Sequence, residues 1–435
     1  MGTLESAVEG INGPINSLVW GWPTVSLIAF TGVGLMIGLR FMPLIRLSYG
    51  LRMLLEPAGQ TGEGEITPFQ ALMTSLSATI GTGNIAGVAG AIAVGGPGAV
   101  FWMWVIAIFG IATKYAEAVL AVHFRETDDN GEQVGGPMYY IRNGLGSGWS
   151  WMAGLFALFG MLAGFGIGNG VQAFEVSSAL SLVGVPKLVT GAVLGALVFA
   201  VVIGGIRRIA QAASAIVPLM SALYVGSCLL VLLLNISAVP QAFATIFSNA
   251  FTGEAAAGGA LGQVILMGFK RGIFSNEAGL GSAPIAHAAA RTDDPVRQGT
   301  VAMLGTFIDT LVICTMTALV IITTQAHQLT TAAGERLSGA DLSIAAFNAG
   351  INGSGVVVTV GLVIFAFTTI LGWSFYGERC TTYLFGESAI LPFRLIWVAV
   401  VVIGAVAGDR GVIWAVADTL NGLMALPNLL ALSLN

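Results

Sequence analysis

The stretch "SATIGTGNIAGVAGAIAVGGPG", residues 77–98, is apolar enough for a membrane helix, yet it carries repeated glycines and the polar residues Thr79, Thr82 and Asn84. Glycine is one of the weakest helix formers. Irregular backbone at membrane depth is tolerated only where protein or a polar cavity satisfies its N–H and C=O groups. The stretch therefore predicts a membrane helix that is broken near Gly81 and Gly83, with a polar site at the break.

Composition indicates that the surrounding solvent is lipid. Of 435 residues, 56% are hydrophobic and 9% are charged, against about 25% charged in an average soluble domain. Apolar runs long enough to span a bilayer recur almost to the C-terminus. The chain is therefore predicted to be an all-α integral membrane protein with about eleven spans, near residues 22–39, 69–94, 98–122, 150–182, 188–205, 211–235, 259–287, 299–323, 354–377, 391–407 and 411–430.

Several classes of protein are disfavoured by simple counts. The three cysteines, Cys228, Cys314 and Cys380, show no paired spacing, so neither a disulfide framework nor a zinc site is indicated. The net charge of −5 is small and scattered, which gives no indication of a nucleic-acid partner. No Lys or Arg precedes Arg40, so the first span lacks the basic region of a cleaved signal peptide and is expected to be retained.

The basic residues predict the orientation, because cytoplasmic loops carry an excess of Lys and Arg. With eleven spans, Lys187, Arg336 and Arg410 fall on one side of the membrane. Eleven basic residues fall on the other side: Arg40, Arg46, Arg52, Arg125, Arg142, Arg207, Arg208, Arg291, Arg297, Arg379 and Arg394. We expect a multi-pass protein of the cell membrane with its N-terminus outside and its C-terminus in the cytoplasm.

An internal repeat links the first break to a second one. "NIAGVAGAIA" at 84–93 has a counterpart in "NEAGLGSAPIA" at 276–286, five spans later, and an offset of five spans reverses the direction through the membrane. This arrangement predicts a five-plus-five inverted repeat, as in many transporters. Residues 1–66 would form an N-terminal segment with one extra span and a cytoplasmic loop. Residues 67–430 would form one transporter domain, with repeats at about 67–236 and 258–430.

Glycines mark both breaks, Gly81 and Gly83 in the first and Gly279 and Gly281 in the second. Half-helix N-termini offer N–H groups to a carboxylate, and freed carbonyl groups suit an ammonium group or Na⁺. The alternative interpretation is that the small residues only allow close helix packing.

Three motifs resemble the sodium:alanine (alanine or glycine:cation) symporter family. They are "GGPGAVFWMWVIAIFG" at 95–110, "GGPMYYI" at 135–141 and "GFKRGIFSNEAGLGSAPIAHAA" at 268–289, and the likeness extends over about residues 67–425. The resemblance implies the LeuT-like fold of the amino acid, polyamine and organocation superfamily. It also implies uptake of alanine or glycine by alternating access, coupled to Na⁺ or to H⁺, with no cofactor besides the coupling ion.

A small zwitterion agrees with the residues themselves. Glu277 is the only acidic residue at the centre of either break, whereas a cationic amine would favour a fixed carboxylate there. Phe274 and Trp373 could narrow the cavity, and Gln172 could point an amide into it. Ordinary helix packing or a lipid-facing position is the alternative for the two aromatic residues. The predicted substrate-binding residues are Thr79, Gly81, Gly83, Asn84, Gln172, Phe274, Ser275, Asn276 and Trp373.

The resemblance also implies a cation site of neutral oxygens, which a hard cation prefers. LeuT-like folds carry an adjacent hydroxyl pair opposite the first broken helix, and Thr368 and Thr369 match it. The same alignment brings the carbonyl groups of Ser77 and Ile80 beside this pair. The alternative is that each threonine only bonds a carbonyl one turn back. A second cation site would have Thr79 and Asn84 as its nearest candidates.

Other buried charges suggest ion pairs. Lys114 and Glu117 are spaced for an i, i+3 pair, and Asp309 could pair with Lys270 or Arg271 to close an external gate. The three histidines lie at span ends and far apart, which argues against a proton relay and against a membrane enzyme. A channel would need a continuous lined pore, whereas two antiparallel breaks provide one central site.

Overall fold

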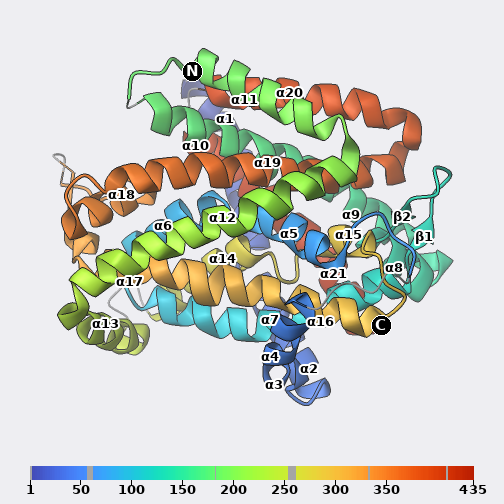
Figure 1. The fold of residues 1–435 in the computed structure, drawn as a ribbon, viewed down its shortest axis with the longest axis horizontal. Helices are drawn as coiled ribbons and strands as arrows, with labels where there is room; N and C mark the ends of the chain where they lie inside the picture. Colours follow the sequence, from blue (N-terminus) through green and yellow to red (C-terminus); the bar gives the residue numbers. More distant parts are fainter. Residues whose placement is uncertain (1, 56–61, 182, 253–260, 332–333, 408–409) are drawn as a thin grey trace.

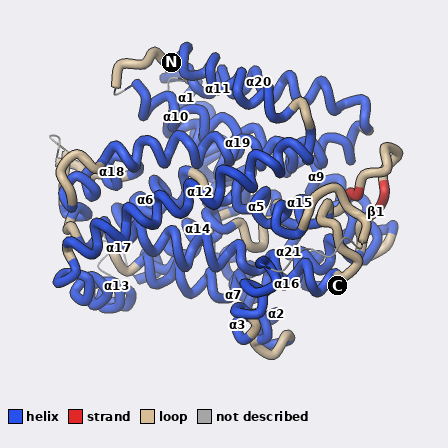
Figure 2. The backbone as a smooth tube through the Cα atoms, viewed as in Figure 1, coloured by secondary structure: helices blue, strands red, loops and turns tan. Residues whose placement is uncertain are grey.

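The computed structural model describes residues 2–55, 62–181, 183–252, 261–331, 334–407 and 410–435. The described chain is helical almost throughout, as expected of an all-α membrane protein (Figure 2). Its sheet is a small antiparallel pair, β1 (Glu126–Thr127) and β2 (Gln133–Val134). Residues 258–260, where the expected second repeat and its first span would begin, lie outside the described part.

The N-terminal segment contains more helix than the pattern of apolar runs predicts. Its elements are α1 (Gly2–Val19), α2 (Trp22–Gly38), α3 (Met42–Ile45) and α4 (Leu47–Leu55). Helix α1 was not expected, because its Ser, Glu, Asn and Gly residues interrupt the apolar run. It packs on the last helix of the chain, where Trp20 Nε1 donates to the carbonyl of Asp418 at 2.6 Å.

The first expected repeat contains eight α-helices in the described residues, and a ninth, α13, lies between the two expected repeats. They are α5 (Pro68–Thr79), α6 (Val88–Gly95), α7 (Ala99–His123), α8 (Pro137–Gly144), α9 (Ser150–Ala163), α10 (Val171–Ser181), α11 (Lys187–Val202), α12 (Gly205–Leu234) and α13 (Val239–Thr252). The second expected repeat contains eight: α14 (Leu261–Asn276), α15 (Ala283–Ala288), α16 (Pro295–Thr306), α17 (Thr315–Thr323), α18 (Gly339–Gly350), α19 (Gly355–Phe385), α20 (Ile390–Val406) and α21 (Arg410–Leu434). Helix α18 lies between the expected spans 299–323 and 354–377.

The helix lengths agree with the predicted fold class. Eight helices of the described chain are long and apolar enough to cross a membrane, and the bent pair α5 and α6 makes a ninth. The remaining two expected spans are α11, which has only 16 residues, and the pair α14 and α15, in which the second helix has only 6. Equivalent helices of the two expected repeats pack against each other, α7 on α16 and α11 on α20 (Figure 1).

Both predicted breaks are present, but their glycines act differently. Helix α5 begins with a capping box between Thr67 and Gln70 and ends at Thr79, and the chain then bends by 53° before helix resumes at Gly83. Neither Gly81 nor Gly83 has a positive φ. In the second break, between α14 and α15, Gly279 and Gly281 have φ of 90° and 82°. These left-handed angles favour glycine.

Three spans contain wide π-helical turns near the middle. They are η1 (Gly83–Gly87), η3 (Gly164–Gly170) between α9 and α10, and η5 (Phe307–Cys314) between α16 and α17. Such turns frequently mark functional sites. Here η1 and η5 contact each other, and α19 packs on η3.

Candidate functional site

The first break is held by side-chain amides from two elements. The N–H of Gly81 donates to Oδ1 of Asn84 at 2.9 Å, and the N–H of Thr82 reaches Oε1 of Gln172 at 3.5 Å. Gln172 is fixed in turn, because its Nε2 donates to the carbonyl of Ile167 at 3.0 Å. Gly81, Asn84 and Gln172, three residues of the predicted substrate site, therefore lie together.

Asp309 connects the two breaks, a role that the sequence analysis missed. Its carboxylate accepts hydrogen bonds from Asn84 Nδ2 at 2.7 Å, from Ser275 Oγ at 2.8 Å and from Thr310 Oγ1 at 2.8 Å. Asn276 Nδ2 donates to Thr310 Oγ1 at 3.0 Å. The end of α14 and the start of η1 are therefore both tied to η5. The available signal was the acidic residue itself, because ionisable groups inside a membrane mark functional positions by default.

The expected pairing of Asp309 with Lys270 or Arg271 is wrong. Lys270 Nζ lies 2.8 Å from Asp418 Oδ2 on α21. The guanidinium of Arg271 lies over an aromatic ring, 5.5 Å from the centroid of Phe274. Both cations lie on the turns of α14 before the break, where they face α21 rather than η5.

The aromatic residue Phe274 lies against the first break. A Cβ on Gly83 would meet the Phe274 ring at 3.5 Å, which is ordinary contact. The other side of Phe274 stacks on Trp414 of α21, with ring centroids 5.4 Å apart and planes inclined by 28°. Thr79 stays within α5, where its hydroxyl donates to the carbonyls of Ser75 and Leu76.

The predicted cation ligands divide into two groups. Thr369 Oγ1 lies 3.4 Å from the carbonyl oxygen of Ile80, at the end of α5. Ser77 also faces α19, because a Cβ on Gly372 would meet its hydroxyl at 2.7 Å. Thr368 instead donates to the carbonyl of Phe365 at 2.9 Å within its own helix. Two neutral oxygens that face each other at a helix end, those of Thr369 and Ile80, suit a hard cation such as Na⁺.

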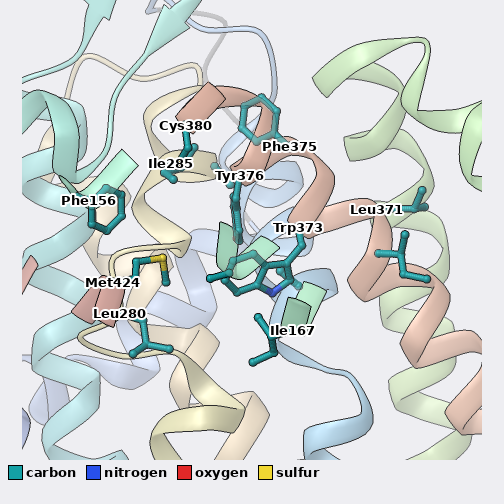
Figure 3. Close-up of a cluster of buried hydrophobic side chains, with 14 of the residues drawn as sticks. Phe156, Ile167, Leu280, Ile285, Leu371, Trp373, Phe375, Tyr376, Cys380 and Met424 are labelled. Carbon is teal, nitrogen blue, oxygen red and sulfur yellow. The ribbon is translucent and has the colours of Figure 1, made fainter. Parts of the chain in front are cut away.

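Trp373 belongs to the second break rather than to a lipid-facing surface. Its side chain is 1% exposed, and Nε1 donates to Oε1 of Glu277 at 2.9 Å. Figure 3 shows the indole in a buried cluster with Ile167, Leu280 and Met424. The carboxylate of Glu277 also accepts a hydrogen bond from Ser282.

Glu117 satisfies the backbone of the second break. Its Oε1 accepts hydrogen bonds from the N–H groups of Gly279 and Gly281, each at 3.1 Å, and from Asn428 Nδ2 at 2.7 Å. The predicted i, i+3 ion pair with Lys114 is not formed in the described structure. The ammonium of Lys114 is buried and has no hydrogen-bond partner among the described residues. Burial of backbone N–H groups requires such an acceptor, and no sequence spacing identified Glu117 as that acceptor.

A cavity and a closed contact lie on opposite sides of the breaks. The cavity, of about 350 Å³, lies between α6, α14, α18 and α21, and its lining includes Gly90, Arg271, Ser338 and Trp414. At the ends of α5 and α15 that point away from it, residues 63–66 pair along their backbones with residues 289–292.

Arg125 reinforces this pairing. Its guanidinium donates to the carbonyls of Ala290 at 2.8 Å, Thr292 at 2.7 Å and Glu63 at 3.1 Å. We call this set of contacts, the paired segments together with Arg125, the Arg125 bridge. It joins the chain that enters the first broken helix to the chain that leaves the second.

Two broken helices that face each other around a buried polar site, with a cavity on one side and a closed bridge on the other, define a secondary transporter of the LeuT-like fold. The solved structure of MhsT in complex with L-phenylalanine shares this fold, with a TM-score of 0.59 at 14% identity over 86% of this chain and 89% of that chain.

The family follows from sequence comparison. The model of the sodium:alanine symporter family matches residues 5–434, and the chain belongs to that family. It is 51% identical to the sodium/alanine symporter AgcS of Methanococcus maripaludis, over 97% of this chain and 93% of the relative. It is 40% identical to the probable sodium/glutamine symporter GlnT of Bacillus subtilis, over 99% of this chain and 89% of the relative. The chain is a sodium-coupled amino acid symporter, as the sequence motifs predicted.

Proposed function

We propose that this protein carries alanine or glycine together with Na⁺ into the cell by alternating access, without chemical change to either. The observation that carries the proposal is the meeting of the two helix breaks around one buried site, with a cavity on one side and the Arg125 bridge on the other. Arg125 and Arg291, from loops predicted to be cytoplasmic, lie at the bridge. The cavity is therefore the external approach, and this structure is closed toward the cytoplasm.

The charges of the site support a small zwitterion. Asp309 is occupied by three donors, and Glu277 by Trp373 and Ser282, so neither carboxylate is left for a cationic amine. A substrate carboxylate would take the N–H groups of the first break, which Asn84 and Gln172 hold in this structure. The predicted second cation site beside Asn84 gains no support, because Asn84 is engaged by Gly81 and Asp309.

The binding of substrate and the binding of Na⁺ are coupled, because the two sites use neighbouring atoms. Na⁺ is transported cargo, and we assign it to the oxygens of Thr369, Ile80 and Ser77, with Thr368 beside them. Gly81 lies between this set and the substrate site: a Cβ on it would meet Thr369 Oγ1 at 2.5 Å, and its N–H donates to Asn84. Filling the cation site therefore fixes the peptide that presents its N–H to the substrate.

Counterflow into proteoliposomes tests the proposal. Vesicles preloaded with unlabelled alanine should accumulate labelled alanine when Na⁺ is present on both sides, but not when Li⁺ or K⁺ replaces it. A panel of glycine, D-alanine, valine, leucine and glutamine defines the substrate range. Accumulation that needs a proton gradient and ignores Na⁺ would support the proton-coupled alternative. Flux that does not saturate would indicate a channel.

A further inference from the structure

Trp373 is held between two residues that belong to different spans. Its indole N–H donates to Glu277 at the second break, and its Cβ and Cγ lie on the backbone of Gly168 in η3. Tyr376, one turn further along α19, meets the ring edge to face, with centroids 5.6 Å apart. In Figure 3 the indole lies beside Ile167 and points from α19 toward the second break.

Gly168 is required at this contact by space rather than by its backbone angles. A Cβ at this position would lie within 3.0 Å of three Trp373 side-chain atoms, Cβ, Cγ and Cδ2. Real Cβ atoms do not approach other atoms so closely, so any side chain here must displace the indole or separate η3 from α19. A Cβ on Gly154, in the same span, would meet nothing within 4 Å. Gly154→Ala therefore provides a matched control.

Glu277 has a backbone conformation that disfavours any side chain. Its φ is 57°, in the left-handed region, where a residue other than glycine is uncommon. Such conformations cluster at functional sites, where the surrounding structure maintains them. The side chain is 2% exposed and bridges Trp373 of α19 to Ser282 at the start of α15. The carboxylate thus fixes the indole relative to the break.

The contact between Trp373 and Gly168 lies one helical turn from the first break. Thr369 precedes Trp373 by four residues and contacts Ile80, while Gln172 follows Gly168 by four residues and reaches Thr82. Residues four apart share a helix face. The same two spans therefore make two successive layers of contact. In one layer both spans reach the first break, and in the next Trp373 lies on Gly168.

We propose that Glu277 and Gly168 are positioning residues that set the size limit of the substrate site by fixing the Trp373 indole, although neither contacts the substrate. This inference rests on the proposed function and on the prediction from sequence that Trp373 narrows the substrate cavity. Glu277 holds the indole from the side of the break, and Gly168 allows it to recede toward η3.

The two residues should change selectivity in opposite directions. Glu277→Leu removes the acceptor and so releases the indole. The concentration of valine that displaces half of the labelled alanine should then fall about tenfold, the lower end of the effect of one methylene in an apolar pocket. Glu277→Gln keeps an acceptor oxygen and should retain wild-type selectivity, although it also removes the charge. Gly168→Ala should push the indole into the site and weaken alanine binding relative to glycine by a similar factor. Gly154→Ala should change neither ratio.

A double variant separates positioning from a general loss of structure. Trp373→Phe keeps the Cβ and Cγ that meet residue 168 but carries a smaller ring. In the Gly168→Ala background the displaced ring should therefore occupy less of the site and restore the ratio of alanine to glycine affinity. The measurement is competition binding on purified, monodisperse protein at saturating Na⁺, with glycine, alanine and valine as competitors. The same three competitors are also tested on the purified Trp373→Ala variant.

The outcomes distinguish the two levels of the proposal. If the wild type binds neither alanine nor glycine, the proposed function fails. If Trp373→Ala changes the selectivity but Gly168→Ala and Glu277→Leu do not, the site stands and the positioning roles are overturned. Equal loss of selectivity in Glu277→Gln and Glu277→Leu would assign the effect to charge and also overturn the inference. If Glu277→Leu does not fold, the Gly168→Ala and Glu277→Gln results decide.

Discussion

Two neighbouring threonines on α19 direct their hydroxyls to different places. Thr369 faces the carbonyl of Ile80 across the helix interface, whereas Thr368 bonds back to Phe365 within α19. The back-bonded interpretation that applies to a lone membrane threonine therefore describes the hydroxyl of Thr368 but not that of Thr369.

The first prediction follows from this difference. Thr369→Ala should raise the Na⁺ concentration for half-maximal alanine binding by about tenfold or more, because even groups that only support a metal ligand are worth that much. Thr368→Ala should have a much smaller effect. Isothermal titration of Na⁺ dependence in detergent gives both values, and an unchanged value for a folded Thr369→Ala would remove this hydroxyl from the cation site.

The second prediction concerns the glycines of the first break. A Cβ on Gly81 would meet Thr369 Oγ1 at 2.5 Å, whereas one on Gly83 meets only ordinary contacts. Neither residue needs a positive φ, so conformational restriction, the reason that sequence alone gives for both, does not apply. Gly81→Ala should therefore sharply weaken both Na⁺ and alanine binding, and Gly83→Ala should weaken them much less. The reverse order in a binding assay would contradict this geometry.

At the scale of elements, the Arg125 bridge closes one side of the molecule. Gly64 has a φ of 140°, and a Cβ there would meet the Ala290 carbonyl at 2.5 Å. Close backbone approach and the fork of donors in a guanidinium, which lysine lacks, together hold the two segments. The bridge must open if α5 and α15 are to expose the site to the other side.

The third prediction is that weakening this bridge favours the open state. Arg125→Lys should increase hydrogen exchange within segments 63–66 and 289–292. The amides concerned are those hydrogen-bonded across the bridge, the N–H groups of Glu65, Ile66, Arg291 and Thr292. Arg142→Lys, at a half-exposed pair with Glu126, is the matched control and should leave those amides unchanged. Mass spectrometry on the reconstituted protein measures both, and equal exchange in the two variants would show that Arg125 does not hold the bridge.

At the scale of the whole molecule, orientation in the membrane is a prediction from the arginine-rich loops. The three native cysteines are buried, so single cysteines can be introduced with little background. Ser17 on α1 and Asp129 in the β1–β2 turn are exposed. They lie on opposite sides of the membrane if the N-terminus is external.

The fourth prediction tests this orientation. A membrane-impermeant maleimide added to intact cells should label Ser17→Cys, and it should label Asp129→Cys only after the cells are permeabilised. The opposite pattern would invert the topology and place the cavity on the cytoplasmic side. Labelling of both positions in intact cells would contradict the predicted span count.

The amino-acid sequence by itself determined that the protein lies in a lipid bilayer, which fold class it has and where both helix breaks occur. These properties follow from local patterns: apolar run length, basic loops, and glycines beside Asn in two matched stretches. The family motifs then indicated a sodium-coupled amino acid symporter. The sequence could not show α1, because a helix that packs on α21 through Asn16, with Trp20 directly after its end, does not need a continuous apolar face.

Only the tertiary structure decided which polar groups meet. Asp309, Glu117 and Glu277 are all visible as charges within apolar spans. The partners that join them to other spans lie tens to hundreds of residues away. Spacing along one helix predicted a Lys114–Glu117 pair, whereas Glu117 accepts hydrogen bonds from backbone N–H groups of the second break instead. The physical reason is that a buried acceptor goes to the donors that have no other partner, and the fold determines which donors those are.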